Sequence, residues 1–246
     1  MASIKFFLSL ALFISCLTTL NAQQAMNTNQ ALDSKHQSII SIAAVTAKGD
    51  LPKLKTELNT GLDAGLTVNQ IKEALIHLYA YCGFPRSIRG LQTFMEVLDE
   101  RKAKGINDKM GNEASPIDEK GSKYERGKRI LGELTKTPPP DTLSGYSTFA
   151  PVIDTFLKEH LFADIFERDV LTWQERELVT VSVLSSIGGV EPMLQSHLKI
   201  CLNVGLTPEQ LQHFVDIIKS TAGESEAKAA QSVLDDVLKK HNQANL

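Results

Sequence analysis

The stretch that decides the fold is residues 171–205, LTWQERELVTVSVLSSIGGVEPMLQSHLKICLNVG. Apolar residues at helical spacing lie on both sides of Gly188 and Gly189, and paired glycines favour a turn. The stretch therefore predicts two helices joined by a short turn. Each helix carries one residue suited to chemistry, Glu177 in the first and His197 in the second.

A weaker copy of this stretch lies at residues 32–65, LDSKHQSIISIAAVTAKGDLPKLKTELNTGLDAG. Five apolar or cap positions recur 140 residues apart, Pro52, Leu54, Leu58, Leu62 and Gly65 matching Pro192, Leu194, Leu198, Leu202 and Gly205. A capping box, Thr-x-x-Gln, follows each copy and opens the next helix. No stretch alternates apolar and polar residues over strand length. We therefore expect an all-α fold of two tandem helical repeats, because a single repeat unit rarely buries its apolar face alone.

The first residues have the composition of a secretory signal. Lys5 precedes an apolar run, residues 6–14, that is too short to span a bilayer. We expect a signal peptide at residues 1–22, cut after Ala22, and hence an exported, periplasmic or secreted protein. A lipoprotein anchor at Cys16 and a cytoplasmic N-terminal helix are the alternatives. No other run is long and apolar enough to cross a membrane.

The rest of the chain divides into three predicted parts. They are a first repeat at 23–104, a linker and helical lead-in at 105–170, and a second repeat at 171–246. In the first repeat, Gly83 and Pro85 predict that one helix ends near residue 82 and that another begins. In the lead-in, a helix is predicted from Lys123 to the proline run after Thr137. The apolar, aromatic residues 149–166 are predicted to cover part of the core or an oligomer contact.

Charge and cysteine content narrow the possible partners. The net charge is −3 with no basic face, so we do not expect a nucleic-acid partner. Removal of the signal leaves Cys82 and Cys201, whose positions in the two repeats do not correspond. We expect two separate buried thiols rather than a disulfide.

Three segments carry a resemblance to a known family. They are FADIF at 162–166 leading into ERELVT at 175–180, HLKICLNVGLT at 197–207, and YAYCGFPR at 79–86. These segments resemble the carboxymuconolactone decarboxylase and alkylhydroperoxidase D superfamily, in a tandem two-repeat form. The resemblance implies an all-helical fold of alkylhydroperoxidase D-like repeats. It also implies a homo-oligomeric ring, here a trimer of two-repeat chains.

The peroxide-reducing branch of this superfamily uses a Cys-x-x-Cys pair ahead of a histidine. With that histidine aligned on His197, the cysteine columns hold Val190 and Met193, and in the first repeat Asp50 and Lys53. Peroxide reduction of this kind needs an attacking thiolate and a resolving thiol. The dithiol is missing. A peroxiredoxin-type activity that uses Cys82 or Cys201 as a lone thiol stays an alternative, as does a non-catalytic helical oligomer that binds a small ligand.

The decarboxylase branch keeps the histidine without the cysteines, and the resemblance implies a cofactor-free lyase acting on a small carboxylated lactone or related acid. Loss of carbon dioxide leaves an electron-rich carbon that needs a proton, and histidine titrates near working pH. We predict His197 and Glu177 as catalytic residues, with no metal. Three further residues are predicted to bind substrate, Arg176, Tyr81 and Arg86.

Each candidate has an ordinary structural alternative. His197 could be a helix histidine with a satisfied partner, and Glu177 an acid that favours a helix start. Tyr81 could simply pack, and Arg86 could lie on a solvated face. At 1.5 Å per residue, Glu177 lies about 16 Å before the turn and His197 about 9 Å after it, so a simple hairpin would leave them apart. A steep crossing or a neighbouring unit is needed.

Glu73 and His77 lie four apart on one predicted helix face of the first repeat. That spacing suits a salt bridge or a shared site equally.

Overall fold

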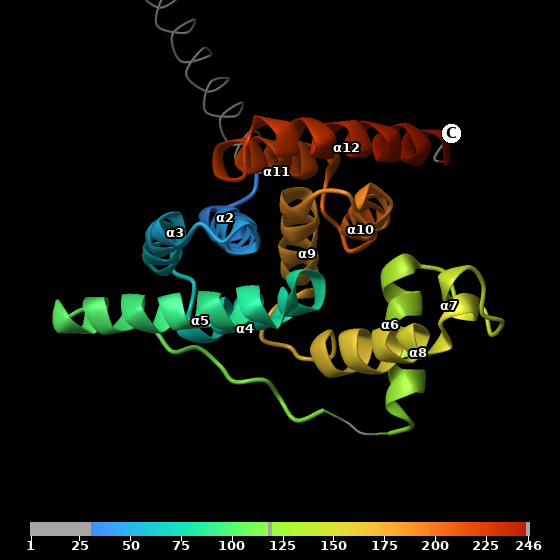
Figure 1. Cartoon of the computed structure of the whole chain (residues 1–246), viewed down its shortest axis with the longest axis horizontal. Coiled ribbons are helices and arrows are strands. Elements are labelled where there is room, and N and C mark those ends of the chain that lie inside the picture. Colours follow the sequence, from blue (N-terminus) through green and yellow to red (C-terminus); the bar gives the residue numbers. More distant parts are fainter. Residues whose placement is uncertain (1–30, 118–119, 245–246) are drawn as a thin grey trace, which may run out of the picture.

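The computed structural model describes residues 31–117 and 120–244. Every regular element in these residues is a helix, which confirms the all-α prediction (Figure 1). The predicted signal peptide at residues 1–22 and the alternative anchor at Cys16 lie outside the described residues.

Two sets of four helices make up most of the fold. The first set is α2 (Ser34–Lys48), α3 (Leu51–Asp63), α4 (Val68–His77) and α5 (Tyr79–Ala103). The second set is α9 (Trp173–Ile187), α10 (Glu191–Asn203), α11 (Pro208–Thr221) and α12 (Glu224–Ala244). Both predicted capping boxes form, one before α4 and one before α11. Gly65 and Gly205 end equivalent helices with φ of 91° and 98°, a conformation that glycine adopts without strain. The tandem repeat is confirmed.

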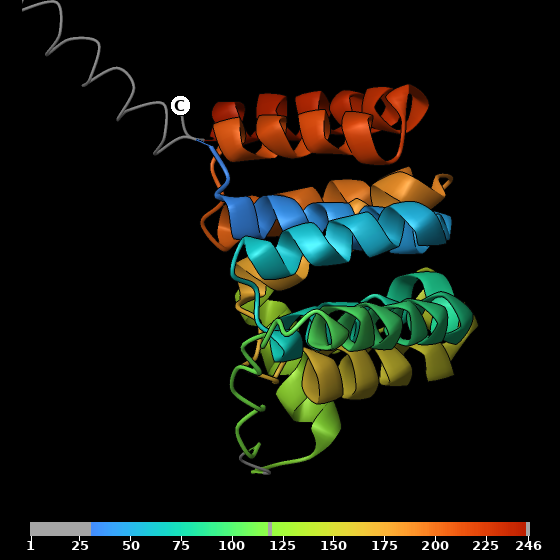
Figure 2. The same cartoon turned by 90° about the vertical axis from the view of Figure 1, so that its left-hand side faces the viewer.

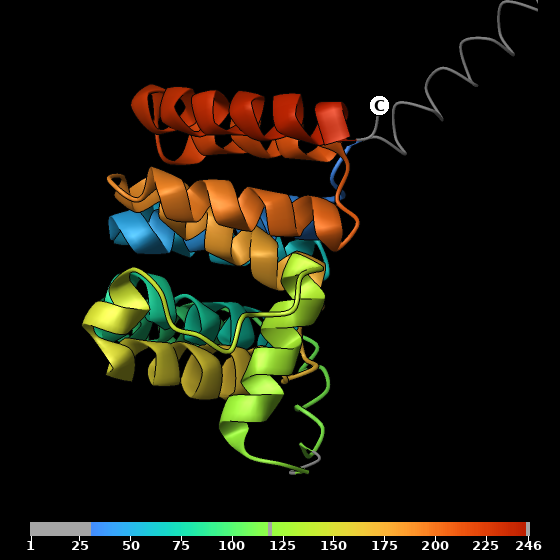
Figure 3. The same cartoon turned by 90° about the vertical axis from the view of Figure 1, so that its right-hand side faces the viewer.

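The helices stack in layers. Figures 2 and 3 show α11 and α12 in an outer layer, with α2, α3 and α10 beneath them. Helices α4 and α5 form the next layer. Helix α9 passes between the layers and contacts α2, α10 and α5.

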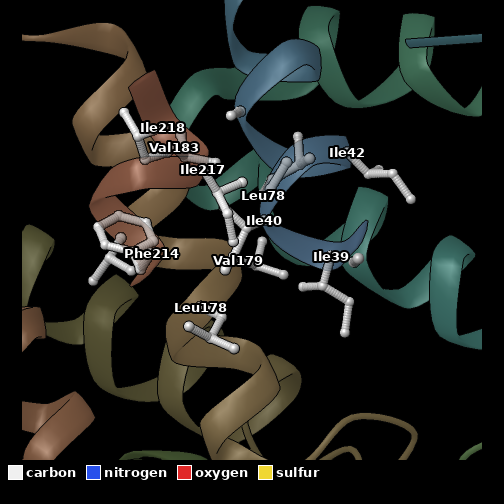
Figure 4. Close-up of a cluster of buried hydrophobic side chains, with 14 of the residues drawn as sticks. Ile39, Ile40, Ile42, Leu78, Leu178, Val179, Val183, Phe214, Ile217 and Ile218 are labelled. Atoms are coloured by element: carbon white, nitrogen blue, oxygen red, sulfur yellow. The ribbon is translucent and has the colours of Figure 1, made fainter. Parts of the chain in front are cut away.

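The core is built on two helices that are buried nearly all round, α2 and α9. Ten consecutive residues of α2, from Ser38 to Ala47, are buried, as are twelve of α9, from Glu175 to Ser186. Figure 4 shows isoleucines of α2 meeting Val179 and Val183 of α9 and aromatic and aliphatic residues of α11. A helix with no solvent face belongs at the centre of a domain.

Several buried positions on these two central helices are serine or threonine. Most of their hydroxyls donate to the carbonyl four residues earlier, as Thr46 does to Ile42 and Ser182 does to Leu178, whereas the Ser185 hydroxyl has no partner among the described residues. A buried hydroxyl without a partner would be costly, and this local bond satisfies it. The central helices therefore tolerate small polar residues inside the core.

The lead-in forms a second, smaller helical cluster. Its helices are α6 (Lys123–Thr135), α7 (Tyr146–Phe149), α8 (Pro151–Thr155) and the π-helix η1 (Phe156–Ile165). The predicted start at Lys123 is confirmed. A second apolar cluster includes Leu161, Phe162 and Phe166, so the prediction that residues 149–166 cover core holds for these side chains. Phe149 is 92% exposed, however, and covers none of it.

Helices α6 and η1 cross at backbone contact. A Cβ at Gly127 would lie 1.7 Å from the carbonyl oxygen of Lys158, so only glycine fits at this crossing. The close crossing fixes η1 against α6. π-helical turns are rare and are frequently found at functional sites.

The predicted break near residue 82 is confirmed. Gly83 has a non-helical backbone (φ 82°, ψ 160°), so α5 consists of two helical segments that meet there. A further boundary, between the end of α4 at His77 and the start of α5 at Tyr79, was not predicted. After α5 the chain runs extended. The carbonyls of Lys109 and Met110 accept from the first amides of α4, which no helical carbonyl can satisfy.

Candidate active site

Glu177 and His197 meet within one chain. The Nδ1 atom of His197 lies 2.8 Å from Oε2 of Glu177. Helices α9 and α10 pack against each other, and Figure 3 shows them running side by side. The expectation that a simple hairpin would leave acid and histidine apart is therefore wrong. The contact forms within one chain, without a neighbouring unit.

The pair lies at the edge of the buried core. The Glu177 side chain has no exposed surface, and that of His197 is 14% exposed. A hydrogen bond between Nδ1–H and the carboxylate selects the tautomer whose Nε2 is left for a ligand. Among the described residues Nε2 has no hydrogen-bond partner, and neither does the second carboxylate oxygen of Glu177. The pair thus has the geometry of a histidine oriented by an acid.

His197 lines a cavity of about 700 Å³. Helices α5, α6, α9 and α10 supply its walls together with η1, and residues 139–147 run across it. Most of the lining is apolar, and includes Leu131, Leu143, Leu157, Leu161, Phe162 and Ile200. Ligand sites commonly have about 300–1,000 Å³ of volume and mainly apolar walls with a few polar groups.

Tyr81 brings the first repeat into this cavity. Its ring meets the His197 ring edge-on, with centroids 5.7 Å apart and planes at 86°. Its hydroxyl is buried and makes no hydrogen bond of ordinary geometry in the described part of the chain, although Thr180 lies close by. Burial, and next the Glu177 carboxylate, raise the pKa of this hydroxyl. The ring rather than the hydroxyl therefore faces a ligand.

A cluster of polar side chains lines another part of the cavity wall. It includes Lys158 of η1 and Asp154 of α8. The Lys158 ammonium lies 2.7 and 2.6 Å from the two carboxylate oxygens of Asp154 and 2.9 Å from the Tyr124 hydroxyl. That hydroxyl donates to Asp154 at 2.7 Å. Lys158 is only 5% exposed.

No motif in the sequence singles out this cluster. Asp154 and Lys158 are four residues apart, the spacing of an ordinary surface ion pair on a helix. Tyr124 comes from a helix that is distant in sequence, and only the fold joins the three and covers them.

The sequence pattern of the carboxymuconolactone decarboxylase family matches residues 17–94 and 151–236, together about two thirds of the chain. The chain belongs to this family. Two curated proteins are similar to it. The 4-carboxymuconolactone decarboxylase of Acinetobacter baylyi is 26% identical over 118 residues, which cover 48% of this chain and 87% of that protein. An uncharacterized protein of Methanocaldococcus jannaschii is 26% identical over 81 residues, or 33% of this chain and 76% of that protein.

The thiols of this family member are poorly placed for the peroxidase alternative. Cys82 and Cys201 are both free, which confirms two separate thiols. Burial raises the pKa of Cys82 to about 11 against the opposing charge of Arg86. Burial, and then the Glu177 carboxylate, raise the pKa of Cys201 well above its ordinary value. Thiolates are the reactive form, so both thiols are held in the unreactive form at neutral pH.

Arg176 does not line the cavity. Its side chain has no exposed surface and donates to the Glu73 carboxylate at 2.7 Å and to the Arg168 carbonyl at 2.6 Å. Burial lowers the pKa of Arg176, and the Glu73 carboxylate opposes that shift. The structure thus gives this arginine a place in a buried ion-pair network away from the cavity lining.

Glu73 and His77 belong to that same network. Arg176 donates to Nδ1 of His77 at 3.3 Å, and Nε2 of His77 donates to the Thr180 hydroxyl at 2.9 Å. Arg168 forms two further hydrogen bonds with the Glu73 carboxylate, at 2.8 and 2.9 Å. The spacing of Glu73 and His77 was compatible with a salt bridge or with a shared site. In the structure both side chains instead bind residues of α9 and thereby connect α4 to α9.

Arg86 is also distant from the His197 cavity. It is exposed on α5 and lines a shallow hollow with Cys82, Lys48 and Ile187. Its guanidinium lies against Gly49 at the C-terminal end of α2, where a Cβ would come within 1.6 Å of Nη1. A cation there favours the negative end of the helix dipole.

No group of three or more histidine, cysteine, aspartate or glutamate side chains gathers as a metal site in residues 31–117 and 120–244. In the same residues, no helix is long and apolar enough to cross a membrane.

Proposed function

We propose that this protein is a cofactor-free lyase of the carboxymuconolactone decarboxylase type, acting on a carboxylated lactone or a related acid. The observation that carries the proposal is the His197–Glu177 contact at the wall of a largely apolar cavity. The family assignment supports the same class of reaction.

His197 acts as the proton carrier in this proposal. The bond from the carboxyl carbon to its neighbour breaks, carbon dioxide leaves, and the bonding electron pair stays on the neighbouring carbon and its conjugated system. The protonated imidazole gives its Nε2 proton to that carbon, and the neutral ring regains a proton from water. The reaction consumes one proton and needs no oxidant or reductant.

Glu177 and Tyr81 support the imidazole from two sides. The Glu177 carboxylate accepts from Nδ1, holds the ring in one tautomer and stabilises the imidazolium, as the aspartate of a catalytic triad does. The Tyr81 ring edge limits rotation of the imidazole. The apolar wall excludes water from the electron-rich carbon, so that the proton comes from the histidine.

The test compares two chemistries on the same preparation of the chain. The protein is incubated with carboxymuconolactone and a panel of related lactone and unsaturated acids, and separately with an organic peroxide plus a thiol. We expect carbon dioxide release from at least one acid and no peroxide consumption above the uncatalysed rate. Peroxide reduction without any carbon dioxide release would contradict the proposal.

A further inference from the structure

The charges on the cavity wall are few. Among the lining residues in the described part of the chain, Lys158 is the only lysine or arginine, and His197 is the only other group that can become a cation. Arg176 and Arg86, the two cations that the sequence suggested for binding acids, lie outside this cavity. The wall therefore offers little to hold several carboxylates.

The positive charge of Lys158 is already balanced by the carboxylate of Asp154. Its ammonium contacts both oxygens of Asp154 and the Tyr124 hydroxyl, which uses its hydrogen-bond donors. Burial alone would raise the pKa of Asp154, but hydrogen bonds from Lys158 and Tyr124 outweigh it and hold that pKa below the ordinary value. Burial alone would lower the pKa of Lys158, but hydrogen bonds with Asp154 and Tyr124 outweigh it and hold that pKa above the ordinary value. Both groups stay charged, and the pair has no net charge.

A carboxylate brought to this end of the cavity would face the Asp154 carboxylate as well as the ammonium. Burying an anion without a cation of its own is strongly unfavourable. A neutral hydroxyl or carbonyl group, in contrast, can exchange hydrogen bonds with an ion pair without adding charge. The Lys158 end therefore favours a neutral polar group.

We infer that the ligand of this cavity has an apolar body and no more than one carboxylate, and is not a dicarboxylate. The single acidic group lies at the His197 end, and a neutral polar group lies at the Lys158–Asp154–Tyr124 end. This inference rests on the proposed function in one respect: the acidic group is placed at the His197 end because the proposed reaction takes place there. It separates this chain from an enzyme for carboxymuconolactone itself, a lactone with two carboxylates.

The test uses three ligands with the same apolar body and different charge. They are 2-naphthalenemethanol, 2-naphthoate and 2,6-naphthalenedicarboxylate, with none, one and two carboxylates. Dissociation constants are measured by calorimetry on the full chain at neutral pH. We expect the alcohol and the monoanion to bind about tenfold or more tightly than the dianion, because the second carboxylate finds no free cation.

The variant Asp154→Asn tests whether the second carboxylate is disfavoured because Asp154 already matches the Lys158 charge. Asparagine keeps the shape and still accepts a hydrogen bond from Lys158, but it leaves the ammonium charge unmatched. We expect the affinity for the dianion to rise about tenfold in this variant, with the affinity for the alcohol unchanged, since only the dianion gains a charge-assisted bond. Met193→Trp controls for where the ligands bind. Met193 is half-exposed and lines the cavity, so tryptophan there should weaken binding of all three ligands.

Three results would overturn the inference. The first is tightest binding of the dianion by the unmodified chain. The second is no gain for the dianion in Asp154→Asn, and the third is no binding of any ligand at millimolar concentration. These readouts are binding constants, whereas the proposed function is judged by carbon dioxide release, so either can fail while the other stands.

Discussion

Arg176 and Glu177 are neighbours in sequence and both lack exposed surface, yet they point to different places. Successive residues of an α-helix differ by about 100° around its axis. Helix α9 therefore directs Arg176 towards Glu73 of α4 and Glu177 towards His197 of α10. The sequence shows two neighbouring charged residues and does not tell their roles apart. Only the packing of α9 between α4 and α10 places Arg176 in the ion-pair network and Glu177 beside the cavity histidine.

Replacing Arg176 by methionine should destabilise the fold. Methionine fills much of the space but leaves His77 without its donor and Glu73 with Arg168 alone. We expect the free energy of unfolding to fall by about 3 kcal/mol, as when one partner of a buried pair is removed. Urea unfolding followed by circular dichroism measures it.

The matched control for this substitution is Arg129→Met. That arginine is 59% exposed and pairs with Glu133 at 3.1 Å and with Glu167 at 3.7 Å, and such exposed pairs contribute about 0–1 kcal/mol. Equal effects of the two substitutions would show that the buried network does not hold α4 to α9.

His77 gives the stability a pH dependence. Burial, and then the charges of Arg176 and His197, hold the pKa of His77 well below 6.5. The unfolded chain then binds a proton that the folded chain does not, so stability is present above pH 6.5 and falls as the pH drops below it. The slope reaches about 1.4 kcal/mol per pH unit for one proton.

The variant His77→Gln tests this dependence. Glutamine can donate to Thr180 and accept from Arg176 but does not titrate. Unfolding curves at several pH values between 6.5 and 5 should show a shallower loss of stability in the variant. Equal slopes for the two chains would remove His77 as the cause.

At the level of helices, local signals predicted well. The capping boxes at Thr67 and Thr207 and the glycines at 65 and 205 act on the backbone within a few residues, and all four behave as their sequence indicates. The break at Gly83 was also predicted, because glycine adopts the positive φ that interrupts the helix there, whereas the boundary between His77 and Tyr79 was not.

The lead-in was harder to predict than the repeats. The π-helical turn η1 depends on its crossing with α6 at Gly127, a contact between segments about thirty residues apart. The sequence of residues 156–165 contains no local signal that predicts a π-helix. The Tyr124–Asp154–Lys158 cluster follows from that crossing and was missed for the same reason.

Gly127→Ala should disturb this crossing. The added Cβ would lie 1.7 Å from a backbone carbonyl, so η1 must move away from α6. We expect a loss of about 1–3 kcal/mol in unfolding free energy, typical of overpacking, together with weaker binding of 2-naphthoate.

Gly132→Ala, on the same helix, is the control for this substitution. Its Cβ would lie 3.1 Å from the Pro139 side chain and 3.7 Å from the nearest backbone atom, the Thr137 carbonyl oxygen, and alanine favours the helix by about 1 kcal/mol. If Gly127→Ala matched this control in stability and binding, the crossing would not set the shape of the cavity.

At the scale of the whole molecule, we propose that the chain assembles into an oligomer. Exposed apolar side chains crowd a short part of the lead-in, with Phe149 at 92%, Val152 at 59% and Phe156 at 58% exposure. Apolar surface gathered in this way usually marks an interface. The trimer predicted from the family resemblance would bury it.

Light scattering on an eluting size-exclusion peak tests this assembly. We expect a mass three times that of one chain, and a shift towards the monomer when Phe149 and Phe156 are both replaced by aspartate. Met95→Asp, at a position 65% exposed on α5, is the control and should leave the mass unchanged. A monomeric unmodified chain at micromolar concentration would contradict the trimer.

The catalytic claim depends on one imidazole, and the chain offers a close comparison for it. His160 pairs with Asp164 at 3.1 Å, but its side chain is 51% exposed and does not line the cavity. It is a histidine–carboxylate pair that lies outside the cavity.

The most direct measurement is the rate of carbon dioxide release by His197→Ala and His160→Ala under identical conditions. The account predicts a fall of about 10²–10⁴-fold for His197→Ala, the usual contribution of a general acid, with helicity at the assay temperature and oligomer mass retained. It predicts no loss for His160→Ala. Undiminished release by His197→Ala would contradict it.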